Sequence, residues 1–192
     1  MIDLYFQVQG KMIRVDHGYA LFSVICHCLG KEFHDAQDVR LALIRGSYIG
    51  DGQLRLLPGS RLTLRLPYEK TDSYIKLSGK NFDLDGHKIS IGGPASQRLI
   101  PAAVLYAHLV TTKNGLDQER FEIEIRRQLD GQVCQGRITV GRRRIFSIHD
   151  KKVVGYSLLV SELTAEESVI LQEQGLGGRR KMGCGFFQPW NG

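Results

Sequence analysis

The stretch 163–187, LTAEESVILQEQGLGGRRKMGCGFF, joins a helix, a glycine-rich loop and a closing strand. Thr164 and Glu167 form a capping-box pattern that predicts the start of the helix, and Gly175 is typical of its C-cap. Residues 175–187 carry five glycines around a basic triplet, RRK. Because glycine is retained where special dihedrals or close backbone approach are needed, we expect a flexible basic ridge that an anionic ligand approaches.

The rest of the chain shows one order of elements twice: strand, helix, two strands, helix, strand. The first half predicts a strand at 2–10, a helix at 16–30 capped by Asp16, strands at 39–46, 52–59 and 60–67, a short helix near 69–77, and two strands around a turn at Asp85–Gly86. The second half predicts a strand at 98–112, a helix at 117–129, two or three strands within 135–163 with turns at Gly141 and His149–Lys151, a helix at 164–175 and a strand at 181–187.

Two consecutive β-α-β-β-α-β units predict an α+β fold of two tandem ferredoxin-like domains. We place their boundary in the turn-rich patch 92–97, GGPASQ, so that the domains span residues 1–94 and 95–192. This scaffold serves RNA-binding domains, metabolic enzymes and regulatory domains alike, so the fold does not decide the function. The sequence lacks the aromatic motif of an ordinary RNA-recognition domain.

The formal net charge of the chain is +6, and three basic clusters, 126–127, 142–144 and 179–181, lie in its second half. A basic surface indicates a nucleic-acid partner, although such charges are often only a solvated face. No apolar run approaches the ~18 residues of a membrane span, and no signal peptide is present. We therefore expect a cytoplasmic protein that does not bind a membrane.

The sequence predicts neither a metal nor a cofactor. The four cysteines, at 26, 28, 134 and 184, show no metal-ligand spacing, and reduced thiols are their simplest interpretation. No two histidines stand at ligand spacing on one helix beside a carboxylate cluster. The glycine-rich loop is a poor nucleotide-binding P-loop, because it follows a helix and lacks Gly-Lys-Ser/Thr.

The glycine-rich loop and the helix before it resemble the signature region of the CRISPR-associated RAMP proteins. Within that superfamily, the chain is similar to the endoribonucleases that process precursor CRISPR RNA, and most of all to the subtype named for myxobacterial systems (MYXAN). The resemblance extends over nearly the whole chain through DHGYALFSVI at 16–25, LIRGSYIGDGQLRLLPGSRLTLRLP at 43–67 and RRQLD at 126–130. The family implies two ferredoxin-like domains, in agreement with the order of elements.

The resemblance implies metal-independent cleavage of CRISPR repeat transcripts at the base of a stem-loop, which makes mature guide RNAs. The 2′-hydroxyl before the cut attacks the phosphorus and leaves a 2′,3′-cyclic phosphate and a 5′-hydroxyl. The product is expected to stay bound within a multisubunit CRISPR effector complex. A non-catalytic RNA-binding RAMP subunit of such a complex is the alternative, and a small-molecule regulatory domain is a more distant one.

Histidine suits the proton transfers of this reaction because its pKa lies near neutral pH. His17 ranks first, since it begins the first helix, whose dipole favours the neutral imidazole, and since the catalytic histidine of the family commonly lies on or near this helix. A structural hydrogen bond to a neighbour is the other interpretation of His17. Tyr19 could position the phosphate or the attacking hydroxyl; His34 ranks second and His27 third. The remaining histidines read as turn or strand residues: His87, His108 and His149.

Two basic segments are the expected RNA contacts. The signature loop supplies three cations and two glycines whose N–H groups can approach the RNA backbone: Arg179, Arg180, Lys181, Gly177 and Gly178. The second segment, in a strand or hairpin, supplies Arg142, Arg143 and Arg144. It could enter the major-groove end of a stem-loop or lie on a solvated edge, and at most two of its side chains face one surface.

Overall fold

The computed structural model describes residues 1–148 and 151–190 of the chain. The chain divides into two compact units, Met1–Arg98 and Leu99–Gly192, so the boundary lies after Arg98, whereas the sequence places it after residue 94. Within the described residues, no helix combines the length and the apolar character that crossing a membrane requires.

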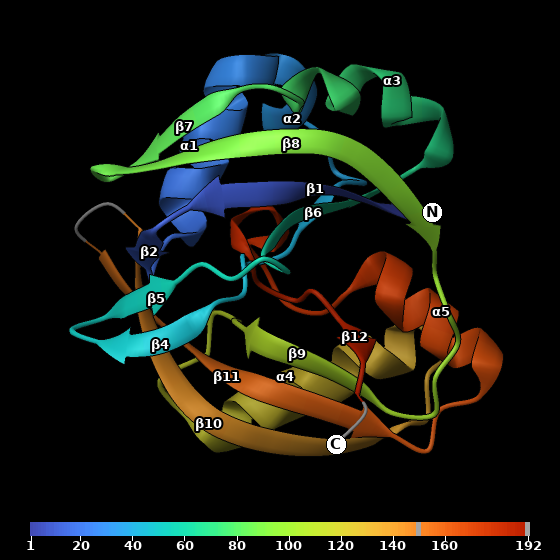
Figure 1. Ribbon diagram of the computed structural model, residues 1–192. Helices are drawn as coiled ribbons and strands as arrows, with labels where there is room; N and C mark the ends of the chain where they lie inside the picture. The colour runs from blue at the N-terminus through green and yellow to red at the C-terminus, as the bar shows by residue number, and fades with distance from the viewer. Residues whose placement is uncertain (149–150, 191–192) are drawn as a thin grey trace. The chain divides into compact units, whose positions relative to one another are not determined.

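The first unit is built on a five-stranded antiparallel sheet of order β3-β6-β1-β8-β7 (Figure 1). Its strands are β1 (Ile2–Gly10), β3 (Arg40–Leu41), β6 (Arg61–Leu66), β7 (Asn81–Leu84) and β8 (His87–Arg98). Apart from the edge strand β7, the strands stand in the chain order second, third, first and fourth. This is the ferredoxin-like order.

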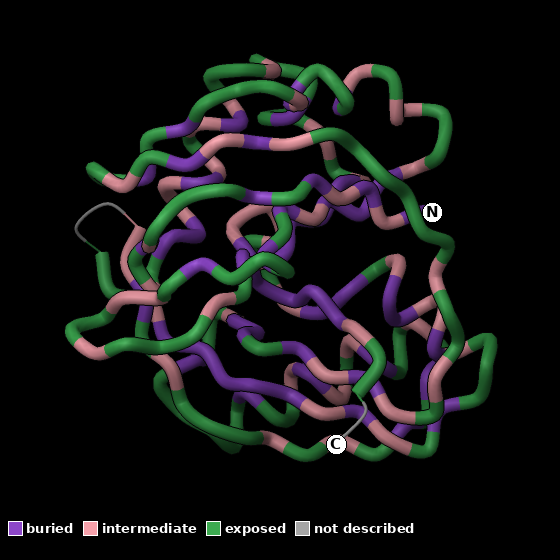
Figure 2. The backbone as a smooth tube through the Cα atoms, viewed as in Figure 1, coloured by how far each residue is buried: buried purple, intermediate pink, exposed green. Residues whose placement is uncertain are grey.

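The helices of the first unit follow β1 and β6. They are α1 (Gly18–Leu29), α2 (Lys31–His34) and a run of three single turns, η1 (Tyr68–Lys70), α3 (Thr71–Tyr74) and η2 (Ile75–Leu77). Alternate residues of β1 are buried, as the purple segments of Figure 2 show, and pack with Leu21 and Ile25 of α1 in one core. Period-two burial is what a sheet covered on one face by a helix requires.

A second, three-stranded sheet lies outside the ferredoxin-like order of the first unit. Its strands are β2 (Met12–Arg14), β4 (Ser47–Gly50) and β5 (Gln53–Arg55), in the order β2-β5-β4. All of its pairs are antiparallel, and Ile13 anchors it because its side chain is fully buried.

The second unit repeats the order with four strands, β10-β11-β9-β12. Its elements are β9 (Leu105–Val110), α4 (Gln118–Gly131), β10 (Arg137–Ile148), β11 (Lys151–Ser161), α5 (Ala165–Gln174), η3 (Arg180–Met182) and β12 (Gln188–Pro189). The capping box of Thr164 and Glu167 is formed at the start of α5. Both units therefore have the ferredoxin-like topology, and the predicted fold class is confirmed.

Several predicted boundaries in the strands are wrong. Residues 92–97 form no turn but the second half of β8, which stays paired with β1 as far as Ile2 and Arg98. The strand expected at 98–112 is only β9, and Pro101, before it, has no N–H to give to a ladder. Gly141 lies inside β10 at a shift of register, where a Cβ would meet the Ser157 hydroxyl. The strands expected at 39–46 and 52–59 shorten to β3 and β5.

Two further predictions about element ends are wrong. The closing strand expected at 181–187 is replaced by η3 and the two-residue β12, because Arg179 and Gly183 have positive φ on either side of η3. His17, and not Asp16, occupies the N-cap position of α1, without a side-chain cap. The hairpin turn at Asp85–Gly86 is confirmed, with both residues at positive φ. Of the turn predicted at His149–Lys151, residues 149 and 150 lie outside the described residues.

Candidate functional site

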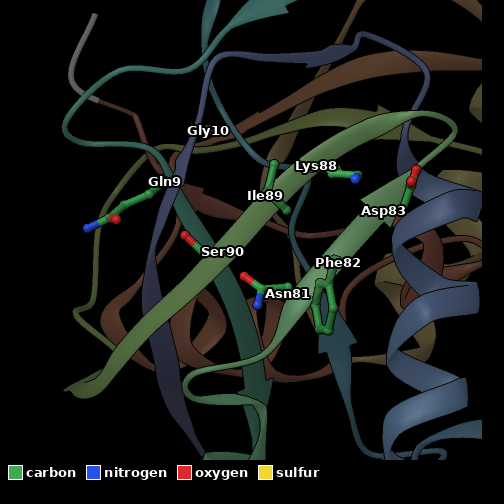
Figure 3. A pocket seen from close by; sticks show the side chains of 8 residues that line it. All are labelled: Gln9, Gly10, Asn81, Phe82, Asp83, Lys88, Ile89 and Ser90. Atoms are coloured by element: carbon green, nitrogen blue, oxygen red, sulfur yellow. The ribbon is translucent and has the colours of Figure 1, made fainter.

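A groove on the first unit contains none of the predicted site residues. Its volume is about 620 Å³, and it is formed by strands β1, β7 and β8 (Figure 3). The lining residues are Gln9, Gly10, Asn81, Phe82, Asp83, Lys88, Ile89 and Ser90. Asp83 lies opposite Lys88 in the sheet register, so the lysine charge is offset within the groove. The groove therefore contains no histidine and no excess of positive charge.

His17 is buried, with 1% of its surface exposed. Its Nδ1 lies 2.8 Å from the Arg14 carbonyl oxygen and 3.1 Å from that of Val15, so Nδ1 carries the proton and donates it. Its Nε2 accepts the N–H of Ile44 at 2.9 Å. Burial lowers the pKa of His17 and outweighs the two carbonyls and Asp16, which favour the charged ring. In this conformation His17 is structural, and its catalytic role stays a prediction that the geometry does not favour.

The lowered pKa of His17 predicts a pH-dependent stability. The ordinary pKa of histidine is 6.5, so below this pH His17 binds a proton in the unfolded chain while it stays neutral in the folded chain. Stability is therefore full above about pH 6.5 and is lost as the pH falls toward the folded-state pKa, by at most about 1.4 kcal/mol per pH unit. Urea unfolding of the wild type and His17→Gln between about pH 7.5 and 5.5 should show a shallower fall for the variant. A His87→Gln control should keep the wild-type slope; equal slopes for wild type and His17→Gln would contradict this assignment.

His34 occupies a different environment at the end of α2. Its side chain is 64% exposed, and its Nδ1 lies 2.7 Å from the Asp35 Oδ1. Since a carboxylate only accepts, Nδ1 donates and Nε2 is left as the basic nitrogen of the neutral ring. The ring centroid of His34 lies 6.1 Å from that of Phe22, which lies 6.3 Å from that of Tyr19. Tyr19 and His34 therefore share Phe22 as a neighbour, whereas the ring of His17 is bonded to the backbone of Arg14, Val15 and Ile44.

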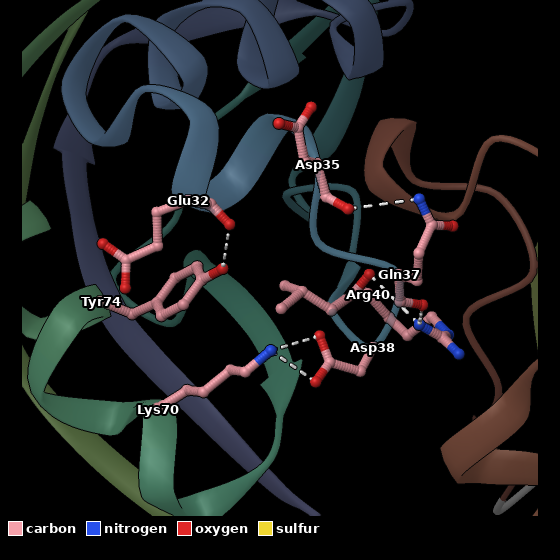
Figure 4. A network of polar contacts seen from close by, with 8 residues as sticks. Glu32, Asp35, Gln37, Asp38, Arg40, Lys70 and Tyr74 are labelled. Carbon is pink, nitrogen blue, oxygen red and sulfur yellow. Dashed lines mark hydrogen bonds and ion pairs between the residues drawn. The ribbon is translucent and has the colours of Figure 1, made fainter.

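The loop that follows His34 is braced by polar contacts (Figure 4). The Gln37 amide donates to the Asp35 carbonyl at 3.2 Å, and the Arg40 guanidinium donates to the Gln37 carbonyl at 2.7 Å. Lys70 holds both carboxylate oxygens of Asp38, at 2.7 and 2.6 Å. Although burial opposes it, the contact with Lys70 lowers the pKa of Asp38, which keeps that carboxylate charged. These contacts fix the segment that carries His34 and Asp35.

Contacts of α2 with Tyr74 of α3 and Phe22 of α1 also hold the segment that carries His34 in place. The Tyr74 hydroxyl donates to the Glu32 carbonyl at 3.4 Å, as Figure 4 shows. Burial, with the nearby carboxylates, raises the pKa of Tyr74 to about 12, so the hydroxyl stays protonated as a donor. Phe33 is fully buried and packs against Phe22 at 5.7 Å and Tyr74 at 6.3 Å between ring centroids. The exposed His34 therefore follows directly on an anchored residue.

The glycine-rich loop of the second unit is tightly bonded. The Gly177 N–H donates to the Gln128 Oε1 at 2.8 Å, and the Gly178 N–H donates to the Thr111 carbonyl at 2.9 Å. The Gln132 amide in turn donates to the Gly175 carbonyl at 2.9 Å. The expectation of a flexible ridge is therefore wrong. The amides of Gly177 and Gly178 are occupied within the unit, so their role toward RNA stays a prediction that cannot use these N–H groups in this conformation.

The three cations of the loop are presented differently. Arg179 is exposed and has a left-handed backbone, with φ of 57°. Arg180 turns back and donates from Nε to the Gly177 carbonyl at 3.1 Å, and burial lowers the pKa of its guanidinium. Lys181 is half-buried. Arg179 is accordingly the member of the triplet that offers its charge most openly to a ligand.

The second arginine cluster lies in β10, where the register with β11 shifts. Val140 pairs with Leu158, and Arg143 is the next residue in register, opposite Tyr156. Arg142 and Arg143 are exposed, whereas Arg144 is half-buried. The Nε of Arg144 is buried without a hydrogen-bond partner in the described part of the chain. Two of the three predicted arginines therefore face solvent, as strand geometry allows.

Two residues of the candidate site were missed by the sequence reasoning, Asp35 and Phe22. The signal for Asp35 was available, because it follows His34 directly, whereas the packing of Phe22 between Tyr19 and His34 required the structure. Within residues 1–148 and 151–190, no group of three histidine, cysteine or carboxylate side chains is placed to hold a metal ion.

The chain is similar to known proteins over nearly its whole length. A family model described as Cas6 Crispr matches residues 2–192. The CRISPR-associated endonuclease Cas6 of Myxococcus xanthus (strain DK1622) is 38% identical over 195 residues, which cover 98% of this chain and 81% of that protein.

Two solved structures share the fold at low sequence identity. A CRISPR-associated protein Cas6 has a TM-score of 0.68 at 14% identity, over 99% of this chain and 98% of its own. A RAMP protein binding different RNA substrates has a TM-score of 0.67 at 9% identity, over 98% of this chain and 99% of its own. From the family match and the curated relative together, the chain belongs to the Cas6 family of CRISPR-associated endoribonucleases.

Proposed function

We propose that this protein cleaves CRISPR repeat transcripts at the base of a stem-loop, without a metal ion, to make mature guide RNAs. The observation that carries the proposal is the exposed His34, oriented by Asp35 at 2.7 Å and lying beside Phe22, which Tyr19 also contacts. A similar protein that is named a CRISPR-associated endonuclease supports the class of substrate.

The reaction needs a base for the 2′-hydroxyl, a proton for the leaving oxygen and positive charge at the phosphate. With Nδ1–H donated to Asp35, the Nε2 of His34 takes the 2′-proton. The 2′-oxygen then bonds to phosphorus while the bond to the 5′-oxygen breaks, and the 5′-oxygen takes up a proton. The upstream product ends in a 2′,3′-cyclic phosphate and the downstream product in a 5′-hydroxyl. Tyr19 holds the phosphate or the attacking hydroxyl in this scheme.

The basic segments of the second unit supply the RNA contacts of the proposal. Arg179 in the loop and Arg142 and Arg143 in β10 are exposed cations suited to phosphate oxygens. Arg180, Lys181 and Arg144 are half-buried, so their charges act on RNA phosphates that come close to the protein surface. Such contacts, independent of the scissile phosphate, would keep the guide RNA bound after cleavage, within a multisubunit CRISPR effector complex.

Cleavage of the repeat RNA encoded beside the gene tests the proposal. In excess EDTA the protein should still cut, and the upstream product should have the mass of a 2′,3′-cyclic phosphate. Replacing the 2′-hydroxyl before the cut by hydrogen should abolish cleavage while binding persists, because the nucleophile is removed and the phosphates are not. A requirement for magnesium, or a product with a 5′-phosphate, would overturn the mechanism. Binding without any product would favour the non-catalytic RNA-binding subunit.

A further inference from the structure

The loop that follows His34, residues 35–38, has anchored ends but few bonds of its own. Phe33 before His34 and Val39 after the loop are buried, with 0% and 1% of their surface exposed. Among the residues that the structure describes, no backbone-to-backbone hydrogen bond involves residues 36–38. The position of the loop between its two anchors therefore depends on side-chain contacts.

Lys70 makes a charged contact with this loop from a distant part of the chain. Its Nζ lies 2.7 and 2.6 Å from the two carboxylate oxygens of Asp38, which precedes it by 32 residues. Lys70 ends η1, so the ion pair ties the run of short helical turns at 68–77 to the loop that follows His34 (Figure 4). A lysine that holds both oxygens of a carboxylate limits where that carboxylate can lie.

Tyr74, four residues after Lys70, holds the chain on the other side of His34. Its hydroxyl donates to the Glu32 carbonyl, and its ring lies edge-on to that of Phe33 at 6.3 Å between centroids. Residues four apart in a helical run lie on the same side of it, and Figure 4 shows both side chains directed toward the segment around His34. One helical turn therefore grips the chain both before and after the histidine.

The loop passes its position on to the ring of His34 through two hydrogen bonds. The Gln37 amide, next to Asp38, donates to the Asp35 carbonyl at 3.2 Å. The Asp35 carboxylate accepts the Nδ1–H of His34 at 2.7 Å. A displacement of Asp38 therefore moves Asp35, and with it the acceptor that orients the imidazole.

The ion pair of Lys70 and Asp38 is exposed rather than part of the core. The two side chains are 39% and 42% exposed. An ion pair in contact with water contributes little to global stability, because solvent screens it. Its loss should therefore release the loop and leave the first unit folded. The effect should appear in the cleavage rate per folded molecule, and not in the fraction of molecules that are folded.

We propose that Lys70 is a positioning residue of the cleavage reaction: its ion pair with Asp38 holds the loop after α2, so that Asp35 keeps the His34 ring in the orientation that receives the 2′-proton. Lys70 does not contact the RNA in this scheme. The inference rests on the proposed function, and it adds a residue from a distant segment that acts only through the histidine.

Single-turnover cleavage of the repeat RNA tests the ion pair. Lys70→Met and Asp38→Asn should each lower the rate per folded molecule about tenfold, because small displacements of a catalytic group slow the reaction. The double variant Lys70→Met/Asp38→Asn should be no slower than the slower single variant, since both changes break the same contact. The exchange Asp38→Lys/Lys70→Asp restores opposite charges and should recover most of the rate. The Kd of every variant for repeat RNA with a 2′-deoxy nucleotide at the cut should stay unchanged.

Two further variants serve as controls. Lys76→Met removes an exposed cation of the same helical run that forms no ion pair among the described residues, and it should cut at the wild-type rate. In a His34→Ala background, Lys70→Met should cause no additional loss, because it acts through a ring that is already absent. Thermal unfolding midpoints give the folded fraction by which each rate is divided.

Three cleavage results would overturn the inference. The first is a wild type that cuts and a Lys70→Met variant that cuts as fast. The second is a weaker Kd for Lys70→Met together with normal cleavage by Asp38→Asn, which keeps the lysine charge; Lys70 would then be an RNA contact. The third is a further loss of rate when Lys70→Met is added to His34→Ala.

A measurement without RNA separates this inference from the proposed function. In ¹⁵N NMR spectra of histidine-labelled protein at about pH 8, where the imidazole is neutral, wild-type His34 should carry its proton on Nδ1. Lys70→Met should shift the ring toward the Nε2–H tautomer, because Asp35 no longer holds it. If this shift occurs but the wild type makes no product, the positioning of His34 stands and the endonuclease proposal fails. An unchanged His34 spectrum would overturn the inference whether or not the protein cuts.

Discussion

The His34→Ala variant is expected to cut repeat RNA about 10²–10⁴-fold more slowly than the wild type in single turnover, which is the range for loss of a general base. Its Kd for the 2′-deoxy RNA should stay unchanged, because in the proposed mechanism His34 acts on the 2′-proton and other residues contact the phosphates. The His87→Ala variant, which removes a histidine beside the β7–β8 turn, is the matched control and should cut at the wild-type rate.

The two measurements together decide between the histidines. A His34→Ala variant that cuts at the wild-type rate would contradict the assignment. A His17→Gln variant that folds normally yet loses cleavage as strongly would return the catalytic role to the first helix. His17→Gln could instead lose both stability and cleavage. If the cleavage rate per folded molecule then equals that of the wild type, the role of His17 is to stabilise the fold.

Gly185→Ala is expected to lower the free energy of unfolding by about 3–5 kcal/mol, among the largest single effects that core-like substitutions produce. Gly185 has φ of 66°, a left-handed conformation that costs an L-residue roughly 1–2 kcal/mol. A Cβ at this position would also clash with the Leu176 carbonyl oxygen, which belongs to a buried stretch of backbone and cannot move aside freely. Urea unfolding at pH 7.5 measures the loss.

Gly178→Ala is the matched control in the same loop. A Cβ added at Gly178 would have no heavy atom of the described chain within 4 Å, and the φ of Gly178 is not positive. The free energy of unfolding is therefore expected to change by no more than about 0.5 kcal/mol. Equal stabilities of the two variants would show that the loop relaxes around the added Cβ, and that the close approach of Gly185 to the Leu176 carbonyl does not contribute to stability. A large loss at Gly178 alone would contradict the open position that the structure gives it.

The order of elements could be predicted because its signals are local. The capping box at Thr164 and the hairpin turn at Asp85–Gly86 are set by residues a few positions apart. The end of β8 could not be predicted in this way, since residues 94–98 are extended through pairing with β1, at the far end of the unit's sequence. Turn-forming composition at 92–97 was overridden by that long-range pairing.

The candidate site was predicted in part for the same reason. Tyr19 and His34 could be named from the sequence because they lie on or just after the first helix, but Phe22 as their common neighbour required the structure. The burial of His17 depends on Ile44, 27 residues away, whose N–H reaches its Nε2. The internal bonding of the glycine-rich loop depends on Gln128 and Thr111, which precede it by dozens of residues. No local pattern at His17 or in the loop reports such partners.

In the proposed function, the bonding of Gly177 and Gly178 has a consequence for the rate at which the loop captures RNA. A segment that is already ordered loses little conformational entropy when a ligand arrives, so association does not wait for the loop to assume its shape. Encounter is then governed by diffusion and by the attraction between the exposed guanidinium of Arg179 and the polyanion. The glycine-rich sequence therefore forms an ordered binding loop. The rate of RNA association with it should depend on ionic strength more than on backbone motion.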